Sequence, residues 1–564
     1  MAVPGGAGTA GIPIPAGVAP SSSDSSLSFH DAVPPQPPVS GLQVAVLLLV
    51  FGLAWLAVLG GTALVPPMDN IEQLDWVRSL QWGYYKHPPL PTALLWPWVQ
   101  LFGLNGWVTY VLGTVVTLLA LGLLWQMLRD MAGSRLATLA LLAVLCITFY
   151  AGRLYYYNHN TVLLLGTVAS AACAWQAFGG TGRRLGWWLL LGLALGITAL
   201  GKYQIGLSVL SLIAFALHER SWRRPEQLRG LLLAGGVSAL VFVPHVLWLV
   251  RSHGEAMDYA LSTSVAATAY GWRSVGESLR WLADQLFNRA LGAWLLLGIG
   301  VWRWRRTRPA EAPRQMPTVQ EGAEPAGGDA LARARVFLLL WGALPLGLME
   351  CMGLVLGSDL QLHWGVAYLP LLVPAVMLCW RGVNWSAVLA QPAVMRSFVV
   401  LQVLLLTHTV LTSSFGPERL RSRHWRTFDA PRVAAALAGP ARQALGHPVA
   451  VLIGDSGVAG ALALQLPERP LVLIGNNYTW SVWVPRDRVA RCGAVLIETG
   501  DRQWDNTPRS ASAEEAHAEL TQDSHPVTKP VQAVTGTVRQ PGGSIPSVTW
   551  TVIPPTLPGG CPAL

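Results

Sequence analysis

The chain has 564 residues, of which 52% are hydrophobic and 12% are charged, and its mean hydropathy is +0.42. Soluble domains usually contain about 25% charged residues, so this composition excludes a chain that folds entirely in water and predicts a membrane protein. The formal net charge of +9 does not predict a nucleic-acid partner, because most basic residues lie in short clusters between apolar runs, as topology signals do.

The N-terminal segment 1–41 is rich in Pro, Gly, Ala and Ser and contains no Lys or Arg. It therefore lacks the positively charged region with which a signal peptide begins. Its low content of large apolar residues predicts a disordered tail.

Residues 42–413 contain apolar runs separated by short polar loops. A helix that crosses about 30 Å of hydrocarbon needs about 20 apolar residues, and on this basis the sequence predicts about eleven transmembrane helices, with 88–103 as an additional half-helix. The runs are 42–65, 107–128, 136–152, 161–178, 185–200, 203–218, 230–250, 284–302, 336–356, 365–380 and 397–413.

The basic residues in the loops predict the orientation of these helices. If the N-terminus is cytoplasmic, the inner loops hold the denser groups of arginine, above all the group from Arg303 to Arg335, whereas the basic residues of the outer loops are spread more thinly. Arginine and lysine are enriched in cytoplasmic loops, so we expect the N-terminus inside and, after an odd number of crossings, the C-terminus outside.

Residues 414–564 have an ordinary composition and predict an extracytoplasmic α/β domain. The short apolar runs 448–453, 471–474 and 494–497 are typical of buried parallel strands. Residues 432–445 have a helical pattern that Pro440 is expected to interrupt. The Thr- and Pro-rich end of the chain predicts either a few strands or a loose tail.

Two features of this domain have alternative interpretations. The segment Gly454-Asp455-Ser456 follows the first predicted strand, where an α/β domain often binds a ligand, although an ordinary turn with a helix cap is favoured. Cys492 and Cys561 are expected to pair only if the domain lies in an oxidising compartment.

Polar residues within a membrane protein are costly, so their positions indicate function. The largest group is the first outer loop, 68–90, where Asp69, Glu72 and Asp75 recur at helical spacing. One short amphipathic helix would present these acids near the membrane surface, and the alternative is a solvated loop. Further polar groups at the outer helix ends are Tyr155 to Asn160, Gly201-Lys202-Tyr203, and Asp359 with His363 and Trp364.

Lys202 interrupts two apolar runs and has only glycine and tyrosine beside it. An ammonium in this position needs an anion, either a carboxylate or a phosphate, unless the side chain reaches the interface on its own. A carboxylate, a cation and amide or imidazole groups that face one outer cavity predict a site that binds an anionic lipid headgroup and deprotonates a hydroxyl. The sequence has no Walker loop, and a nucleotide-driven pump is not expected.

Several of these segments resemble a known family. They are the acidic first loop followed by GYYKHPPL (Gly83 to Leu90), YNHNTVLL (Tyr157 to Leu164), the turn Gly201-Lys202-Tyr203 and, more loosely, HWGVAYLP (His363 to Pro370). Over roughly residues 45–410 the chain resembles the bacterial GT-C glycosyltransferases related to protein O-mannosyltransferases and to the lipid A aminoarabinose transferase, a group similar to glycosyltransferase family 39.

The resemblance implies a multi-pass protein of the bacterial inner membrane that transfers sugar from a polyprenyl phosphate to a glycolipid, a polysaccharide or a protein hydroxyl, with inversion at the anomeric carbon. It implies that Asp69 is the catalytic base and that Lys202, with Lys86 as a second candidate, binds the leaving phosphate. Its other implied partners are membrane lipids. The other candidate substrate-binding residues are Glu72, Tyr85, His87, Asn158, Asn160 and His363.

The chain departs from the family pattern in ways that affect these expectations. Many relatives have Asp-Glu in the first loop, where this chain has Asp69-Asn70, and many have Asp where this chain has Asn160. An amide can orient a sugar hydroxyl but cannot act as a base. Relatives that bind a divalent metal place a carboxylate near the position of Lys86, so we expect neither a metal nor another cofactor.

Two other classes of function compete with the transferase. A transporter or flippase for a lipid or sugar usually places its polar groups at the bilayer midplane, often within repeats, and neither feature is evident here. A structural or receptor role, with inactive helices as an anchor, is kept open by Asn70 and Asn160.

Overall fold

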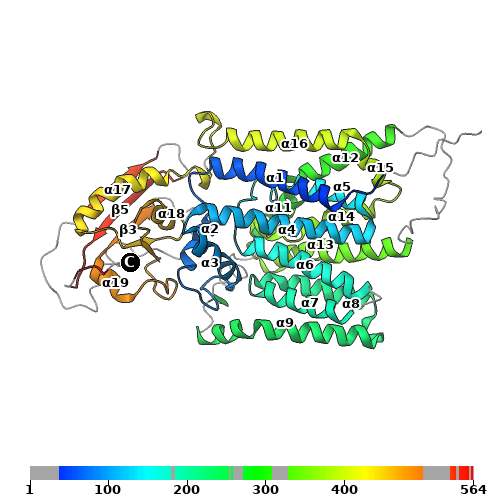
Figure 1. Cartoon of the computed structure of the whole chain (residues 1–564), viewed down its shortest axis with the longest axis horizontal. Coiled ribbons are helices and arrows are strands. Elements are labelled where there is room, and N and C mark those ends of the chain that lie inside the picture. The colour runs from blue at the N-terminus through cyan, green and yellow to red at the C-terminus, as the bar shows by residue number, and fades with distance from the viewer. Residues whose placement is uncertain are drawn as a thin grey trace, which may run out of the picture. The chain divides into compact units, whose positions relative to one another are not determined.

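The computed structural model describes residues 37–179, 184–252, 256–257, 271–307, 328–422, 424–499, 534–540, 545–557 and 560–562 (Figure 1). Most of the predicted tail, up to residue 36, lies outside the described residues. The structure is mainly helical between residues 41 and 411, and a small sheet follows.

Each of the eleven predicted apolar runs overlaps a helix in the described residues. The helices from the N-terminus to residue 251 are α1 (Gly41–Thr62), α2 (Met68–Trp76), α3 (Leu90–Phe102), α4 (Gly106–Ala132), α5 (Ser134–Leu145), α6 (His159–Gly179), α7 (Arg184–Ala199), α8 (Gly206–His218) and α9 (Pro225–Arg251). They are followed by α11 (Trp272–Ala283), α12 (Leu291–Arg306), α13 (Gly328–Leu356), α14 (Leu369–Cys379), α15 (Trp385–Leu389) and α16 (Pro392–Leu411).

Six helices in the described residues are long and apolar enough to cross a membrane, namely α1, α4, α6, α9, α13 and α16. Shorter apolar helices, such as α5 and α14, lie among them. The run 136–152 is only partly helical, because α5 ends at Leu145 and turns lead from there to the polar segment before α6. The chain is therefore a multi-pass helical membrane protein, and the number of crossings stays a prediction.

Glycines allow two of the membrane helices to pack closely. A Cβ atom at Gly192 of α7 would lie 2.6 Å from the carbonyl oxygen of Ala234 in α9, and one at Gly196 would lie 2.8 Å from that of Ser238. Small residues four positions apart let two helix backbones approach each other within a membrane, where packing rather than water exclusion drives association. This contact holds the end of α7, and with it the turn that carries Lys202, against α9.

The C-terminal sheet has the strand order β2-β1-β3-β5-β4. As predicted, β1 (Val451–Gly454) pairs in parallel with β2 (Leu471–Ile474) and β3 (Ala494–Thr499), and all three are largely buried. The strands β4 (Thr535–Arg539) and β5 (Ser547–Ile553) add an antiparallel pair next to β3. The helices of this region are α17 (Ala430–Leu445), α18 (Val458–Gln465) and α19 (Arg486–Cys492).

Two features of the C-terminal region bear on the predictions from the sequence. The first contradicts a prediction, and the second decides between two alternatives. Pro440 lies inside α17 and does not interrupt it, contrary to the prediction. Proline has no N–H to donate to the carbonyl of Ala436, four residues earlier, but Ala436 is exposed and water can replace the missing donor. Cys492 and Cys561 form a disulfide that ties the end of the chain to α19.

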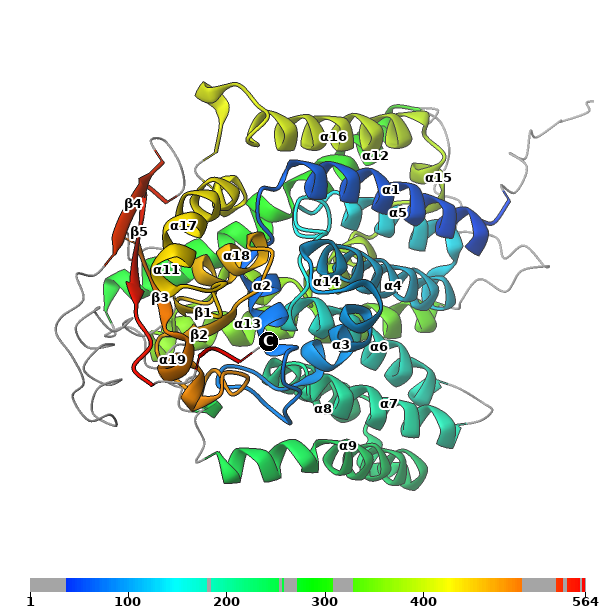
Figure 2. The ribbon, with the colours of Figure 1, turned by 60° about the vertical axis from the view of Figure 1, so that its left-hand side comes forward.

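The segment predicted as the first outer loop, 68–90, packs into the hydrophobic core around the C-terminal sheet. Ile71, Trp76, Tyr84 and Tyr85 belong to the same cluster of buried hydrophobic residues as the sheet. Figure 2 shows α2 between α18 and the ends of the membrane helices, and α2 contacts α18 directly. The alternative of a solvated loop is therefore wrong, because the sheet and its helices cover the apolar face of this segment.

Candidate active site

Asp69 is the second residue of α2, a helix that begins directly after Pro66 and Pro67, and its side chain is half-buried. The Nδ2 of Asn158 donates a hydrogen bond of 2.6 Å to Oδ2 of Asp69. The Oδ1 of Asn158 accepts from the backbone amides of Asn160 and Thr161, at 2.9 and 3.1 Å, as a helix cap does. Because the start of α6 fixes the amide oxygen, the amide NH₂ group must point towards the Asp69 carboxylate.

Asn70 explains one departure from the family pattern. Its amide nitrogen donates to Oγ1 of Thr109 and to the carbonyl of Tyr155, at 2.8 and 3.0 Å, and its Oδ1 accepts from the backbone amide of Tyr157 at 2.9 Å. A glutamate could not make the two donated bonds. Asn70 therefore fastens α2 to the segment before α6 and is a structural residue next to Asp69.

Lys202 is 8% exposed and lies in the turn between α7 and the short 3₁₀ helix Tyr203–Ile205. Its ammonium donates to Oδ1 of Asn160 at 2.5 Å. Burial lowers the pKa of Lys202 to about 7, and the charge of Asp69 partly opposes this shift. The two residues therefore share one site, through the pair Asn158 and Asn160 at the start of α6.

The neutral amide of Asn160 leaves the charge of Lys202 uncompensated at this contact. An aspartate at this position would pair with the ammonium and neutralise it, whereas the amide oxygen only orients it. The second departure from the family pattern thus yields a buried cation that is available to an incoming anion.

Three imidazoles surround this cation. The rings of His87 and His159 have centroids 3.7 Å apart, and those of His159 and His363 are 6.4 Å apart. Burial lowers the pKa of His363 to about 3, and Lys202 and Arg153 contribute to the shift. Burial, followed by the charges of Lys202 and Lys86, also lowers the pKa of His87 well below its usual range. Both rings are therefore neutral hydrogen-bonding groups near pH 7.

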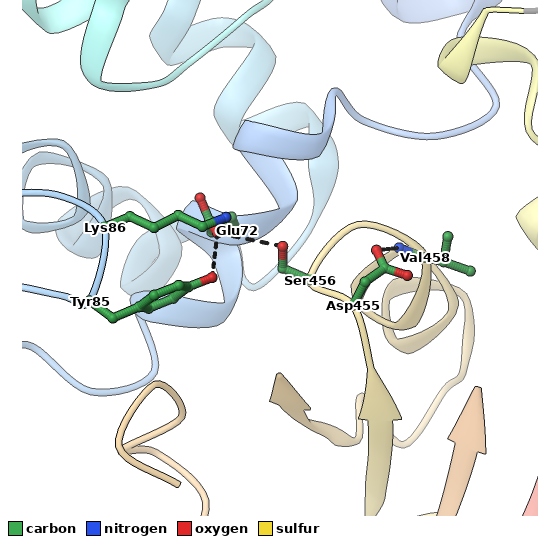
Figure 3. Close-up of polar contacts among 6 residues, drawn as sticks. All are labelled: Glu72, Tyr85, Lys86, Asp455, Ser456 and Val458. Atoms are coloured by element: carbon green, nitrogen blue, oxygen red, sulfur yellow. Dashed lines mark hydrogen bonds and ion pairs between the residues drawn. The ribbon is translucent and has the colours of Figure 1, made fainter. Parts of the chain in front are cut away.

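Lys86 has a different environment from Lys202. Its ammonium lies 2.7 Å from Oε1 of Glu72 in a buried ion pair, and the hydroxyl of Tyr85 donates to the same oxygen at 3.2 Å (Figure 3). Glu72 thus compensates the charge of Lys86. Of the two candidate cations, Lys202 is better suited to bind a phosphate.

The C-terminal sheet region contributes residues to this group. The hydroxyl of Ser456 donates to Oε1 of Glu72 at 3.4 Å (Figure 3), and the ring of Trp480 stacks on Tyr85 with 4.7 Å between centroids. Asp455 accepts from the backbone amide of Val458, the first residue of α18, at 2.7 Å, as expected of an ordinary turn that leads into a helix. This turn after β1 also contacts the first outer loop through Ser456.

A histidine in α9 links the two lysine-bearing segments. His245 is fully buried; its Nδ1 lies 2.6 Å from the carbonyl oxygen of Trp82, and its Nε2 lies 2.7 Å from the hydroxyl of Tyr203. The carbonyl can only accept, so Nδ1 carries the proton and the Tyr203 hydroxyl donates to Nε2. Gly83 is required here, because a Cβ atom would lie 2.4 Å from the ring of Trp248.

All nine residues proposed from the sequence lie in two adjoining groups. The first group consists of Lys202 and the residues around its buried ammonium, which are Asp69, Asn158, Asn160, His87 and His363. The second is the neighbouring ion-pair group of Glu72, Tyr85 and Lys86. The sequence analysis did not select His159, His245, Ser456 or Trp480. His159 stands in the quoted YNHN segment and Ser456 in the turn after the first predicted strand, so both could have been included, whereas His245 and Trp480 had no sequence signal. In the described residues, no three His, Cys, Asp or Glu side chains are arranged to hold a metal ion, and the expectation of no metal stays a prediction.

Comparison with known proteins supports the family resemblance. Residues 86–248 match the model of the family described as dolichyl-phosphate-mannose-protein mannosyltransferase. The chain is 28% identical, over 215 residues, to the lipopolysaccharide core galacturonosyltransferase RgtA of Rhizobium johnstonii. This match covers 37% of the chain and 41% of that relative, so it spans less than half of the relative's length.

The fold resembles that of a solved membrane protein. The crystal structure of ArnT from Cupriavidus metallidurans bound to undecaprenyl phosphate superposes with a TM-score of 0.58 at 17% identity and covers 93% of this chain and all of that one. The apo form of the same protein gives a TM-score of 0.57 at 16% identity, over 91% of this chain and 98% of that one. At this level of identity the likeness concerns the fold, which includes the C-terminal region.

Proposed function

Since the chain resembles the GT-C glycosyltransferases in sequence and in fold, we propose that it transfers a sugar from a polyprenyl-phosphate donor to a hydroxyl of a cell-envelope acceptor. The proposal rests on one observation: Asp69 and Lys202 lie in the same site, where Asn158 donates to the carboxylate and Asn160 accepts from the ammonium. The undecaprenyl phosphate bound to the fold relative supports a lipid-phosphate donor.

In the proposed reaction Asp69 is the general base. Its carboxylate, which Asn158 orients, accepts the proton of the acceptor hydroxyl while the hydroxyl oxygen attacks the anomeric carbon. The bond between that carbon and the phosphate oxygen breaks, and the electron pair leaves with the polyprenyl phosphate. A single displacement inverts the configuration at the anomeric carbon and needs no second carboxylate as nucleophile.

Lys202 stabilises the leaving phosphate. Its ammonium is buried, so its attraction for a phosphate oxygen is stronger than in water, and Asn160 holds it without neutralising it. The neutral His87 and His363 beside it are suited to bind sugar hydroxyls or phosphate oxygens. Lys86, which Glu72 compensates, is assigned to the support of the first outer loop rather than to direct contact with the donor.

The site lies at one end of the membrane helices, next to the sheet domain. The distribution of basic residues in the loops supports an extracytoplasmic location of that end in the bacterial inner membrane, with the N-terminus inside. The disulfide between Cys492 and Cys561 agrees with an oxidising compartment. Domain limits of 42–413 for the membrane part, with eleven crossings, and 414–564 for the extracytoplasmic part belong to this proposal.

The proposal is tested with purified protein, undecaprenyl-phosphate sugar labelled in the sugar, and a membrane extract as the source of acceptor. We expect the label to enter a new product with the wild-type chain and not with Asp69→Asn. Movement of the labelled donor across the bilayer without a new product would instead identify a transporter and overturn the proposal.

A further inference from the structure

A pocket of about 470 Å³ lies at the end of the membrane helices that is far from the proposed active site. Its lining comes mainly from the first turns of α13, the end of α14, the turn that follows α14, and α15. Both α13 and α14 extend from this pocket towards the segment that carries His363, and the 29 residues of α13 span about 43 Å. The pocket is therefore separate from the site that contains Lys202, and the proposed reaction does not use it.

The walls of the pocket are held by side-chain hydrogen bonds. The Nε1 of buried Trp385 donates to the carbonyl of Met377 at 3.0 Å, which ties α15 to the end of α14. Arg135, at the start of α5, donates through Nε and Nη2 to the carbonyl of Ser386, at 3.4 and 3.0 Å. Since α5 contacts both α14 and α15 (Figure 1), the shape of the pocket is set by the protein itself and is available to a ligand without rearrangement.

The lining carries positive charge that has no acidic counterpart in the pocket. Arg335 of α13 is half-buried and Arg381, in the turn after α14, is exposed; in the part of the chain that the structure describes, neither forms a salt bridge. The nearby Arg333 differs, because it pairs with Glu219 at 2.8 Å. Asp329 lies in the first turn of α13 and is not among the lining residues. Two guanidinium groups that face one pocket without a carboxylate favour an anionic ligand.

Apolar side chains adjoin both guanidinium groups. Leu331 lies one turn before Arg335 on α13, Trp380 directly precedes Arg381, and both apolar residues line the pocket and are exposed. Val376, one turn earlier on the otherwise largely buried α14, is also exposed. Tryptophan is enriched where the hydrocarbon of a membrane meets water, and arginine is enriched at the cytoplasmic ends of membrane helices. A ligand in this pocket therefore meets a charged and an apolar surface together, which favours a lipid over a soluble anion.

We infer that this pocket binds the phosphate of an anionic phospholipid from the leaflet around this end of the helices. Arg335 and Arg381 donate to the phosphate oxygens, and the acyl chains lie along Leu331 and Val376. With the N-terminus inside, this leaflet is the cytoplasmic one, where basic pockets between membrane helices recognise anionic headgroups. The inference concerns a second binding site and does not depend on the transferase proposal.

The test is a titration of the purified full-length protein, in a detergent without charge, with phosphatidylglycerol, and native mass spectrometry measures the lipid adducts. We expect phosphatidylglycerol to bind more tightly than phosphatidylcholine, which has the same phosphate but no net charge. Arg335→Gln and Arg381→Gln should each weaken the binding of phosphatidylglycerol about fivefold, the effect of removing one basic residue that faces an anionic headgroup. Equal binding of the two lipids by the wild-type chain would overturn the inference.

Two variants control this result. Arg396→Gln removes an exposed arginine at the start of α16, a helix that contacts α15 but does not line the pocket, and it should bind phosphatidylglycerol as the wild type does. Arg335→Lys keeps the charge and should retain most of the affinity. If Arg396→Gln weakens binding as much as Arg335→Gln and Arg381→Gln do, the attraction is general and the pocket is not the site. Thermal unfolding without lipid verifies that each variant is folded, and the exposed position of Arg381 makes its substitution the one least expected to disturb the fold.

A competition experiment separates a lipid from a soluble anion. Inorganic phosphate has the charged group without the acyl chains, so we expect it neither to displace phosphatidylglycerol nor to raise the unfolding temperature. A rise in unfolding temperature with inorganic phosphate alone, absent in Arg381→Gln, would assign the pocket to a soluble anion and overturn the lipid assignment.

Discussion

Lys202→Met is the substitution that tests the phosphate-binding role most sharply. It keeps most of the length and apolar character of the side chain and removes the ammonium that Asn160 orients. Lys202 is 8% exposed in the wild-type chain, and its contact with Asn160 does not neutralise the ammonium. An incoming phosphate therefore gains a charged hydrogen bond in a partly desolvated site. Such bonds contribute about 1.5–3 kcal/mol, which corresponds to roughly 10- to 150-fold in donor affinity.

The pH dependence provides an independent signature of the same group. Because burial lowers the pKa of Lys202 to about 7, the ammonium that binds phosphate is present below pH 7 and is lost as the pH rises above it. Donor affinity should therefore be highest below pH 7 and fall by up to about tenfold per pH unit above it. Lys202→Arg keeps its charge and should lack this fall, and Lys202→Met should lack it because it has no charge to lose.

The assay is equilibrium binding of labelled undecaprenyl-phosphate sugar to the purified protein between pH 5.5 and 9, a range that brackets the titration. Thermal unfolding of each variant controls for loss of fold. An unchanged donor affinity in a folded Lys202→Met protein, or a wild-type affinity that does not fall above pH 7, would refute the role assigned to this ammonium.

Four further substitutions test other parts of the account. Asp69→Asn should reduce turnover by at least about 100-fold, the usual contribution of a general base, with donor binding retained; full activity would show that another group is the base. Trp480→Ala removes the ring stacked on Tyr85 and should raise the donor KM while leaving the membrane helices folded, as measured by steady-state kinetics and circular dichroism. Burial raises the pKa of Asp75, whose Oδ2 has no hydrogen-bond partner among the described residues. This group therefore disfavours the fold increasingly as the pH rises from its unfolded-state pKa towards its folded-state pKa. Asp75→Asn should therefore raise the unfolding temperature at pH 8 and not at pH 4, and an equal effect at both values would contradict the assignment. Cys492→Ser should lower stability by about 2–4 kcal/mol, and adding Cys561→Ser should cause no further loss in thermal unfolding.

The sequence predicted the elements well because each has a local signal. Apolar runs of sufficient length mark the membrane helices, and short runs such as 471–474 mark buried strands. It also indicated that Asp69 and Lys202 face one cavity, because polar residues recur at the same ends of successive helices. Pro440 shows the limit of such rules, because a proline need not end a helix where water can replace the lost hydrogen bond.

The contacts between distant segments had no such signal. The hydrogen bond from Ser456 to Glu72 joins residues 384 positions apart, and the stacking of Trp480 on Tyr85 depends on how the sheet domain lies against the first loop. His245 was not selected, because a lone histidine in an apolar helix does not reveal its partners. The asparagines at 70 and 160 resembled losses of function in the sequence, whereas the structure assigns each a specific hydrogen-bonding role.

The chemistry of the product tests the central claim most directly. Purified protein is incubated with an undecaprenyl-phosphate sugar of known anomeric configuration, the released undecaprenyl phosphate is quantified, and the configuration of the new glycosidic bond is determined by nuclear magnetic resonance. The account predicts one undecaprenyl phosphate for each new bond and an inverted configuration. A retained configuration, or a donor that is moved across the bilayer and recovered intact, would contradict a direct displacement assisted by Asp69 and Lys202.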